Sequence, residues 1–285
     1  MDLEKKISNI ILLGPASTGS KILRDLISQH PLIDKIPYDV TFIWRLGNAN
    51  ILHDELHTNL LTKEKKNKII KHLHHFHQGA PFLLDKTNSN SLRVPFVHAV
   101  LPEAFFIHLL RNPLDVVQSS YRRWQEPPDF GYIFRKARKF PILDAFGYAS
   151  RYAKNAIQNL FGYGNKSWGQ VYIGMDEDLK TKQLLEVCSI QYVKSVEKAI
   201  ESLREINKDK IYTIYYEDFV MDPEKCLREI AVFLNLDHKS FSNVDTSIIT
   251  TRNIGKGARN LSNEEKSVVQ PILNRLINLY EDREF

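Results

Sequence analysis

Two glycines near the start of the chain, Gly14 and Gly19, bracket a short loop with the types and spacing of an anion-binding turn. The loop follows an apolar run at residues 10–13 and precedes a helical stretch at residues 22–27. A strand, a tight turn and a helix in this order aim several backbone N–H groups and a helix N-terminus at one point. These residues therefore predict a site for a phosphate or a sulfate.

The loop is close to the P-loop signature G-x-x-x-x-G-K-[ST], but Ser20 and Lys21 follow Gly19 in the reverse order. One residue of helix turns a side chain by about 100°, so Lys21 does not take the usual place of the P-loop lysine. An ordinary strand-to-helix turn, in which the glycines serve only the turn geometry, is the alternative for this segment.

A second anion signal lies in residues 111–119, directly after an apolar run at residues 105–110. Asn112 can cap a helix that has Pro113 at its first position. Arg111 then stands at the carboxyl end of a strand, where open α/β sheets bind ligands. Ser119 follows about two turns later on the same helical face. The spacing predicts that Arg111 and Ser119 bind one phosphate together.

Four short apolar runs predict the strands that position these loops. They are residues 10–13, 82–84, 105–110 and 211–216, and helical patterns separate them. Uninterrupted apolar strands of this kind indicate an α/β fold with a doubly wound, mainly parallel sheet flanked by helices. With neither an internal repeat nor a linker, we expect one domain over residues 1–285. Within it, residues 121–174 predict an irregular insertion that could bind an acceptor.

Composition narrows the class of protein. The 39 Lys and Arg against 34 Asp and Glu give a net charge of +5, which suits an anionic ligand but is less than nucleic-acid binding usually requires. No apolar run approaches a membrane span of about 20 residues, and the charged N-terminus does not resemble a secretory signal. Cys188 and Cys226 stand far apart, which predicts a reducing, cytoplasmic setting and no structural zinc. We expect no metal site in the His-rich stretch at residues 72–77, where a solvated helix face is favoured.

The two anion motifs resemble those of the sulfotransferases that use 3′-phosphoadenosine 5′-phosphosulfate (PAPS). Residues 16–21 compare with the family loop P-[RK]-S-G-T-T, and residues 111–119 match every fixed position of R-[DN]-P-x-D-V-x-x-S. The resemblance continues from about residue 8 to residue 280. Its further matches are Asp85-Lys86-Thr87, Tyr216-Glu217-Asp218-Phe219 and the basic loop at residues 255–259. The resemblance implies a P-loop-like fold, PAPS as the cofactor and adenosine 3′,5′-bisphosphate (PAP) as its product.

The resemblance also implies roles for individual residues. The 5′-phosphosulfate is expected at the first loop and the 3′-phosphate at the second motif and the basic loop. The expected cofactor residues are Ser17, Thr18, Gly19, Ser20, Lys21, Arg111, Ser119, Lys256, Gly257 and Arg259. Where the family usually has Lys or Arg, this chain has Ser17, so Lys21 or Lys86 is expected to stabilise the charge of the transfer. If neither does, the protein binds PAPS without transferring sulfate.

The expected reaction is sulfuryl transfer to a hydroxyl acceptor, which requires no metal and needs a general base. Asp39 is the first candidate for that base, and the alternatives are His53, Asp54 and His57. Asp39 could instead be a turn residue, and Lys86 could form a surface salt bridge. The family resemblance favours a carbohydrate acceptor, while a lipid, a phenol or a tyrosine stays open. A P-loop small-molecule kinase and a non-catalytic binder of PAPS or PAP are the alternative functions.

Overall fold

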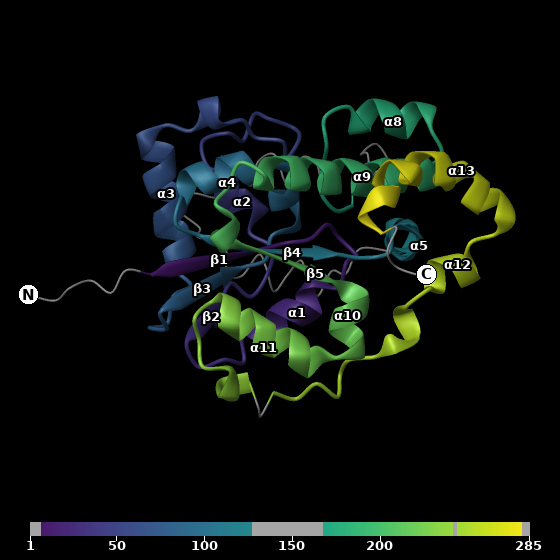
Figure 1. The fold of residues 1–285 in the computed structure, drawn as a ribbon. Helices are drawn as coiled ribbons and strands as arrows, with labels where there is room; N and C mark the ends of the chain where they lie inside the picture. The colour runs from purple at the N-terminus through teal and green to yellow at the C-terminus, as the bar shows by residue number, and fades with distance from the viewer. Residues whose placement is uncertain (1–6, 127–167, 242–243, 281–285) are drawn as a thin grey trace, which may run out of the picture.

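The structure, a computed structural model, describes residues 7–126, 168–241 and 244–280. Its centre is one five-stranded sheet in the order β2-β3-β1-β4-β5, in which every neighbouring pair is parallel (Figure 1). The strands are β1 (Ser8–Leu13), β2 (Ile33–Lys35), β3 (Phe82–Asp85), β4 (Phe105–Leu110) and β5 (Ile211–Tyr215). This order places β1 at the centre of the sheet. The predicted parallel α/β sheet is confirmed.

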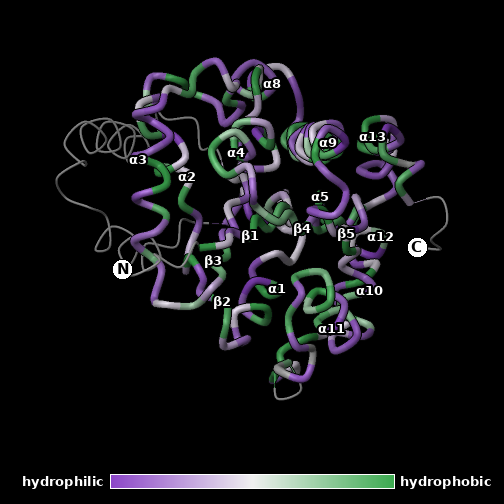
Figure 2. Tube along the Cα trace, turned by 60° about the vertical axis from the view of Figure 1, so that its left-hand side comes forward, coloured by the Kyte–Doolittle hydropathy of each residue, from purple (hydrophilic) through white to green (hydrophobic). Residues whose placement is uncertain are grey.

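Helices cover both faces of the sheet (Figure 1). The helices of the first half are α1 (Ser20–Ile27), α2 (Thr41–Trp44), α3 (Lys63–His74), α4 (Val94–Val100) and α5 (Pro113–Gln125). Those of the second half are α8 (Met175–Thr181), α9 (Leu184–Leu203), α10 (Tyr216–Met221), α11 (Pro223–Phe233), α12 (Lys256–Asn260) and α13 (Asn263–Leu273). In Figure 2 the traces of α3 and α11 alternate between hydrophilic and hydrophobic residues, as expected for helices with one buried face.

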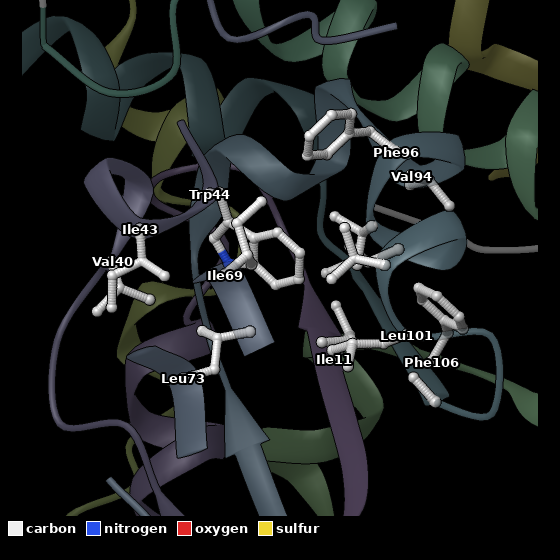
Figure 3. Packing of buried hydrophobic residues seen from close by; sticks show 14 of the residues in the cluster. Ile11, Val40, Ile43, Trp44, Ile69, Leu73, Val94, Phe96, Leu101 and Phe106 are labelled. Carbon is white, nitrogen blue, oxygen red and sulfur yellow. The ribbon is translucent and has the colours of Figure 1, made fainter. Parts of the chain in front are cut away.

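The central strand β1 divides the core in two, because successive side chains of a strand point to opposite faces. Ile11 packs with α2, α3 and α4 in one cluster, part of which Figure 3 shows around Trp44 and Phe96. Ile10 packs with α1, α10 and α11 in the other. Each cluster consists of buried apolar side chains on one face, so the sheet is covered on both faces, as an uninterrupted apolar strand predicts.

The four predicted strands do not include β2, a three-residue edge strand of which only Ile33 is buried. An apolar run is therefore lacking there, and pairing with β3 alone identifies the strand. Helix α5 continues to Gln125, so residues 121–125 of the expected irregular insertion at residues 121–174 are helical. Residues 127–167 of this insertion lie outside the described residues. Among the described residues, no helix combines the length and apolarity that a membrane crossing requires.

Candidate active site

The predicted functional residues meet at one edge of the sheet, where its parallel strands end. The Gly14–Gly19 loop follows β1, Lys86 follows β3, Arg111 follows β4 and Tyr216 follows β5. Asp39 comes four residues after β2. Because all five strands run in one direction, their carboxyl ends share this edge (Figure 1). This is the edge at which open α/β sheets bind ligands.

The loop of residues 14–20, called the anion loop from here on, leaves several backbone donors unused. Among the described residues, the N–H groups of Ser17, Gly19, Ser20 and Lys21 have no hydrogen-bond acceptor. Gly19 caps α1 without a side-chain hydrogen bond and has a φ of 92°. Thr18 points inward instead, and its hydroxyl donates to the carbonyl of Pro15 at 2.8 Å. The loop therefore presents a ring of donors together with the positive end of a helix, which is an anion-binding arrangement.

Close packing explains the glycines of this loop. A Cβ on Gly19 would lie 2.6 Å from two ring carbons of Tyr216, the residue that follows β5. A Cβ on Gly14 would lie 2.8 Å from the hydroxyl oxygen of Thr18. Any larger residue at position 19 would also be strained by the positive φ. The ring of Tyr216 thus packs directly against the anion loop at Gly19.

Ser17 adopts a left-handed conformation, with a φ of 71°, although it is not glycine. Such a conformation costs about 1–3 kcal/mol and persists only where the surroundings impose it. Three contacts do so here. Arg111 donates through Nη1 to the Ser17 carbonyl at 3.0 Å, and Ser120 donates to the Ser17 hydroxyl at 3.3 Å. On the other side, Oε1 of Gln170 accepts the N–H of Ala16 at 3.2 Å.

Asp39 and Lys86 form an ion pair at the same edge of the sheet as the anion loop. Nζ of Lys86 donates to Oδ1 of Asp39 at 2.9 Å, and the lysine is mostly buried while the carboxylate is partly exposed. Among the described residues, Oδ2 of Asp39 has no hydrogen-bond partner. Lys21 lies on α1 with an exposed side chain and no ion pair to any described residue. Of the two lysines predicted to replace the missing cation, Lys86 is therefore held in place and Lys21 is not.

Arg111 connects the anion loop to a second loop, which contains Asn253 and continues into the basic loop at residues 255–259. Its guanidinium is therefore not free for a phosphate alone. Besides Ser17, Arg111 donates through Nη2 to the carbonyl of Asn253 at 2.8 Å, and its guanidinium lies 4.0 Å from the ring centroid of Tyr216. Its buried Nε has no hydrogen-bond partner among the described residues. Ser119 is also buried, and its hydroxyl donates to the carbonyl of Asp115 at 2.8 Å.

The second loop is fastened to the start of α5 by a fully buried carboxylate. Asp115 accepts the N–H of Gly255 at 2.9 Å and the N–H of Gly257 at 2.7 Å. The approach requires glycine at position 257, because a Cβ there would lie 2.2 Å from the carbonyl carbon of Leu114. Helix α12 and Lys256 are thereby held against the N-terminus of α5.

Lys256 lies in an excess of positive charge. Its pKa falls to about 8 because of burial first and then because of Arg111 and Arg122, with a smaller effect of Arg123, while Asp115 acts in the opposite sense. Three arginines around a half-buried ammonium are an unfavourable arrangement unless an anion binds among them. Arg259 extends the basic loop, exposed and donating to the carbonyl of Arg252 at 2.9 Å. We call Lys256, Arg111, Arg122 and Arg259 the cationic cluster.

Sequence reasoning missed Gln170, Ser120 and Asn253, which position the loops. None carries a signal in a single sequence, and Gln170 falls inside the segment predicted to be an irregular insertion. Among the alternatives for the base, Asp54 is buried, lies within 3.5 Å of Arg93 and accepts the N–H of Val171 at 2.9 Å. The structure thus occupies Asp54 with fold-stabilising contacts. No group of three or more potential metal ligands gathers among the described residues.

A family model and several solved structures are similar to this chain. The model of a family described as the sulfotransferase family matches residues 9–138 and 148–240. The sulfotransferase STF9 from Mycobacterium avium has a TM-score of 0.58 at 14% identity, with 96% of this chain and 76% of that chain covered. The sulfotransferase from Alicyclobacillus acidocaldarius has a TM-score of 0.51 at 16% identity, with 98% of each chain covered. The sulfotransferase domain from the curacin biosynthetic pathway has a TM-score of 0.52 at 15% identity, with 95% of this chain and 98% of that chain covered. A search of curated proteins found no match. The structural likenesses confirm the P-loop-like fold.

Proposed function

The chain belongs to the sulfotransferase family, and we propose that it transfers a sulfuryl group from PAPS to a hydroxyl acceptor. One observation carries the proposal: two anion-binding arrangements lie at the same edge of the sheet and share Arg111. The anion loop offers free N–H groups, and the cationic cluster offers an excess of positive charge around Lys256 that lowers the pKa of this lysine. PAPS carries anionic groups at both its 5′ and 3′ positions, so it needs two such sites.

The residues present suit a cofactor with two anionic ends. The N–H groups of Ser17, Gly19, Ser20 and Lys21 would hold the 5′-phosphosulfate. Lys256, Arg259 and the buried Nε of Arg111 would hold the 3′-phosphate, with Ser119 and Gly257 shaping that end. Family membership supports this assignment. PAPS supplies the sulfuryl group and leaves as PAP.

Asp39 is the proposed general base. Lys86 fixes Oδ1 of Asp39 and leaves Oδ2 free, so one carboxylate oxygen is oriented and available to take a proton from an acceptor hydroxyl. Such a base typically contributes about 10²–10⁴-fold to the rate. Lys86 has further N–H donors beside the anion loop, so it can stabilise negative charge that develops during transfer. Lys86 thereby supplies the positive charge that the family usually has at the position of Ser17.

For the acceptor we propose a carbohydrate hydroxyl, which rests on the resemblance of the motifs to glycan sulfotransferases. We place the reaction in the cytoplasm, because the two described cysteines, Cys188 and Cys226, are free and buried. A kinase is less well supported. Its magnesium carboxylate would be Asp85, which is buried and accepts hydrogen bonds from Trp44, Thr87 and Asn90.

Ser17 favours a second candidate function, a binder of PAPS or PAP that transfers nothing. The two candidates are separated by incubating the protein with labelled PAPS, or with labelled ATP, and a panel of glycans, phenols and lipids. A sulfated carbohydrate is the expected product. A phosphorylated product from ATP would support the kinase instead. Tight PAP binding without any sulfated product would support the binder.

A further inference from the structure

We propose that Gln170 is a positioning residue that holds the anion loop in its binding conformation. The inference rests on the proposed function only for its consequence in cofactor binding, because its contacts lie within the protein itself. Gln170 is buried and contacts the anion loop at Ala16, whereas Arg111 contacts it at Ser17. Its Oε1 accepts the N–H of Ala16, the residue directly before the left-handed Ser17.

The orientation of the Gln170 amide is fixed by a chain of hydrogen bonds to α9. The hydroxyl of Ser195 donates to the carbonyl of Gln191 at 2.6 Å, so its oxygen is free to accept. Nε2 of Gln170 donates to that oxygen at 3.0 Å. Because Nε2 must face Ser195, the carbonyl oxygen Oε1 must face the anion loop. The side chain can therefore accept from Ala16 without competing for the N–H groups that bind an anion.

The segment that carries Gln170 is itself anchored at several points. Nε2 of Gln191 donates to the carbonyls of Trp168 and Gln170, both at 2.8 Å. Asp54 and Val171 exchange two hydrogen bonds, from Val171 N–H to the Asp54 carboxylate at 2.9 Å and from Asp54 N–H to the Val171 carbonyl at 2.7 Å. Gln170 is thus a rigid support, not a side chain that happens to touch the loop.

Gln170 helps to hold the energetically costly left-handed conformation of Ser17 in place. Arg111 and Ser120 hold Ser17 at its own carbonyl and hydroxyl, so neither restrains the backbone that leads into Ser17. Gln170 fixes the N–H of Ala16, which belongs to the peptide of residues 15 and 16. Without it, this peptide can rotate, and the N–H groups of the anion loop that have no acceptor are no longer held in one arrangement. Binding at this end of the cofactor then weakens while binding at the cationic cluster does not.

Two variants and a matched pair test the inference. Gln170→Met keeps the size of the side chain but cannot accept from Ala16, and Gln170→Glu keeps the acceptor but adds a negative charge beside the anion site. Ser195→Ala removes only the partner of Nε2. Its control is Ser189→Ala, because Ser189 is a second buried serine of α9 whose hydroxyl donates to the carbonyl four residues earlier but does not contact Gln170.

The first readout is amide hydrogen exchange of the peptide that covers residues 14–20 in the ligand-free protein. We expect faster exchange in Gln170→Met and Ser195→Ala and no change in Ser189→Ala. The second readout is the affinity for PAP relative to adenosine 3′-monophosphate, which lacks the group that the anion loop binds. We expect this ratio to fall about fivefold or more in Gln170→Met, the order of one lost hydrogen bond, and further in Gln170→Glu.

The two readouts separate the inference from the function on which its consequence rests. Unchanged exchange in residues 14–20 of Gln170→Met would overturn the positioning role, whatever the ligand. A wild-type protein that binds PAP and adenosine 3′-monophosphate equally would overturn the placement of the 5′ end, while faster exchange in Gln170→Met would still uphold the positioning role. Equal losses for both nucleotides in Gln170→Met would indicate general destabilisation and would also overturn it.

Discussion

Gly257→Ala is expected to detach the basic loop from the start of α5 and thereby to disrupt the proposed 3′-phosphate site. A Cβ at this position would lie 2.2 Å from the carbonyl carbon of Leu114, 2.3 Å from its oxygen and 2.6 Å from the nitrogen of Asp115. All three are backbone atoms, which cannot rotate aside. Helix α12 must therefore move away from α5, and Lys256 moves with it.

The magnitude follows from the contacts that this movement breaks. The N–H groups of Gly255 and Gly257 both donate to the buried carboxylate of Asp115. Each hydrogen bond to a charged group contributes about 1.5–3 kcal/mol, so we expect the free energy of unfolding to fall by about 3–6 kcal/mol. Urea denaturation followed by circular dichroism measures this loss. Calorimetry should show PAP binding at least about tenfold weaker, because a displaced Lys256 loses a charged contact.

The matched control is Gly174→Ala. Unlike Gly257, Gly174 has a positive φ, 89°, but no atom lies within 4 Å of the position of its Cβ. Strain of the left-handed conformation alone should cost about 1–2 kcal/mol and leave PAP affinity unchanged. If Gly257→Ala is no less stable than Gly174→Ala and binds PAP like the wild type, the close approach of α12 to α5 does not position Lys256.

The remaining predictions concern charge and catalysis. Because burial and the neighbouring arginines lower the pKa of Lys256 to about 8, and a bound phosphate favours its charged form, PAP affinity should fall as pH rises through about 8. Titration of Lys256→Met over the same range should show a weaker affinity without this step. Asp39→Asn should keep PAP binding but reduce transfer at least about 100-fold in an initial-rate assay, and near-normal transfer would assign Asp39 to a turn. Lys86→Met should lower kcat more than PAP affinity, whereas Lys21→Met should change kcat little, since only Lys86 is held at the site. Equal effects of the two lysines on kcat would contradict the assignment of the charge to Lys86.

Local patterns explain which parts of the fold could be predicted. The apolar runs of β1 and β4 are long enough to reveal buried strands, and Asn112 caps α5 with Pro113 at its first position, as residues 111–119 predict. β2 could not be found, since a strand of three residues with one buried side chain has no periodicity to read. Its existence depends on pairing with β3, a tertiary contact.

In the candidate site too, local motifs could be predicted from the sequence and contacts between distant segments could not. The glycines of the anion loop follow from a linear motif, and Arg111 lies where its place after a strand predicts. What Arg111 does there could not be read from the sequence, because its partners Ser17 and Asn253 come from distant segments. Gln170 likewise contacts Ala16 only through the fold.

The central claim, that two anion sites hold the two ends of PAPS, is tested most directly by calorimetry with PAP, AMP and ATP on the wild-type protein. We expect PAP to bind much more tightly than AMP, because only PAP has a 3′-phosphate for the cationic cluster. One charged contact gives a preference of about tenfold or more. Equal affinities for PAP and AMP, or tighter binding of ATP than of PAP, would contradict it.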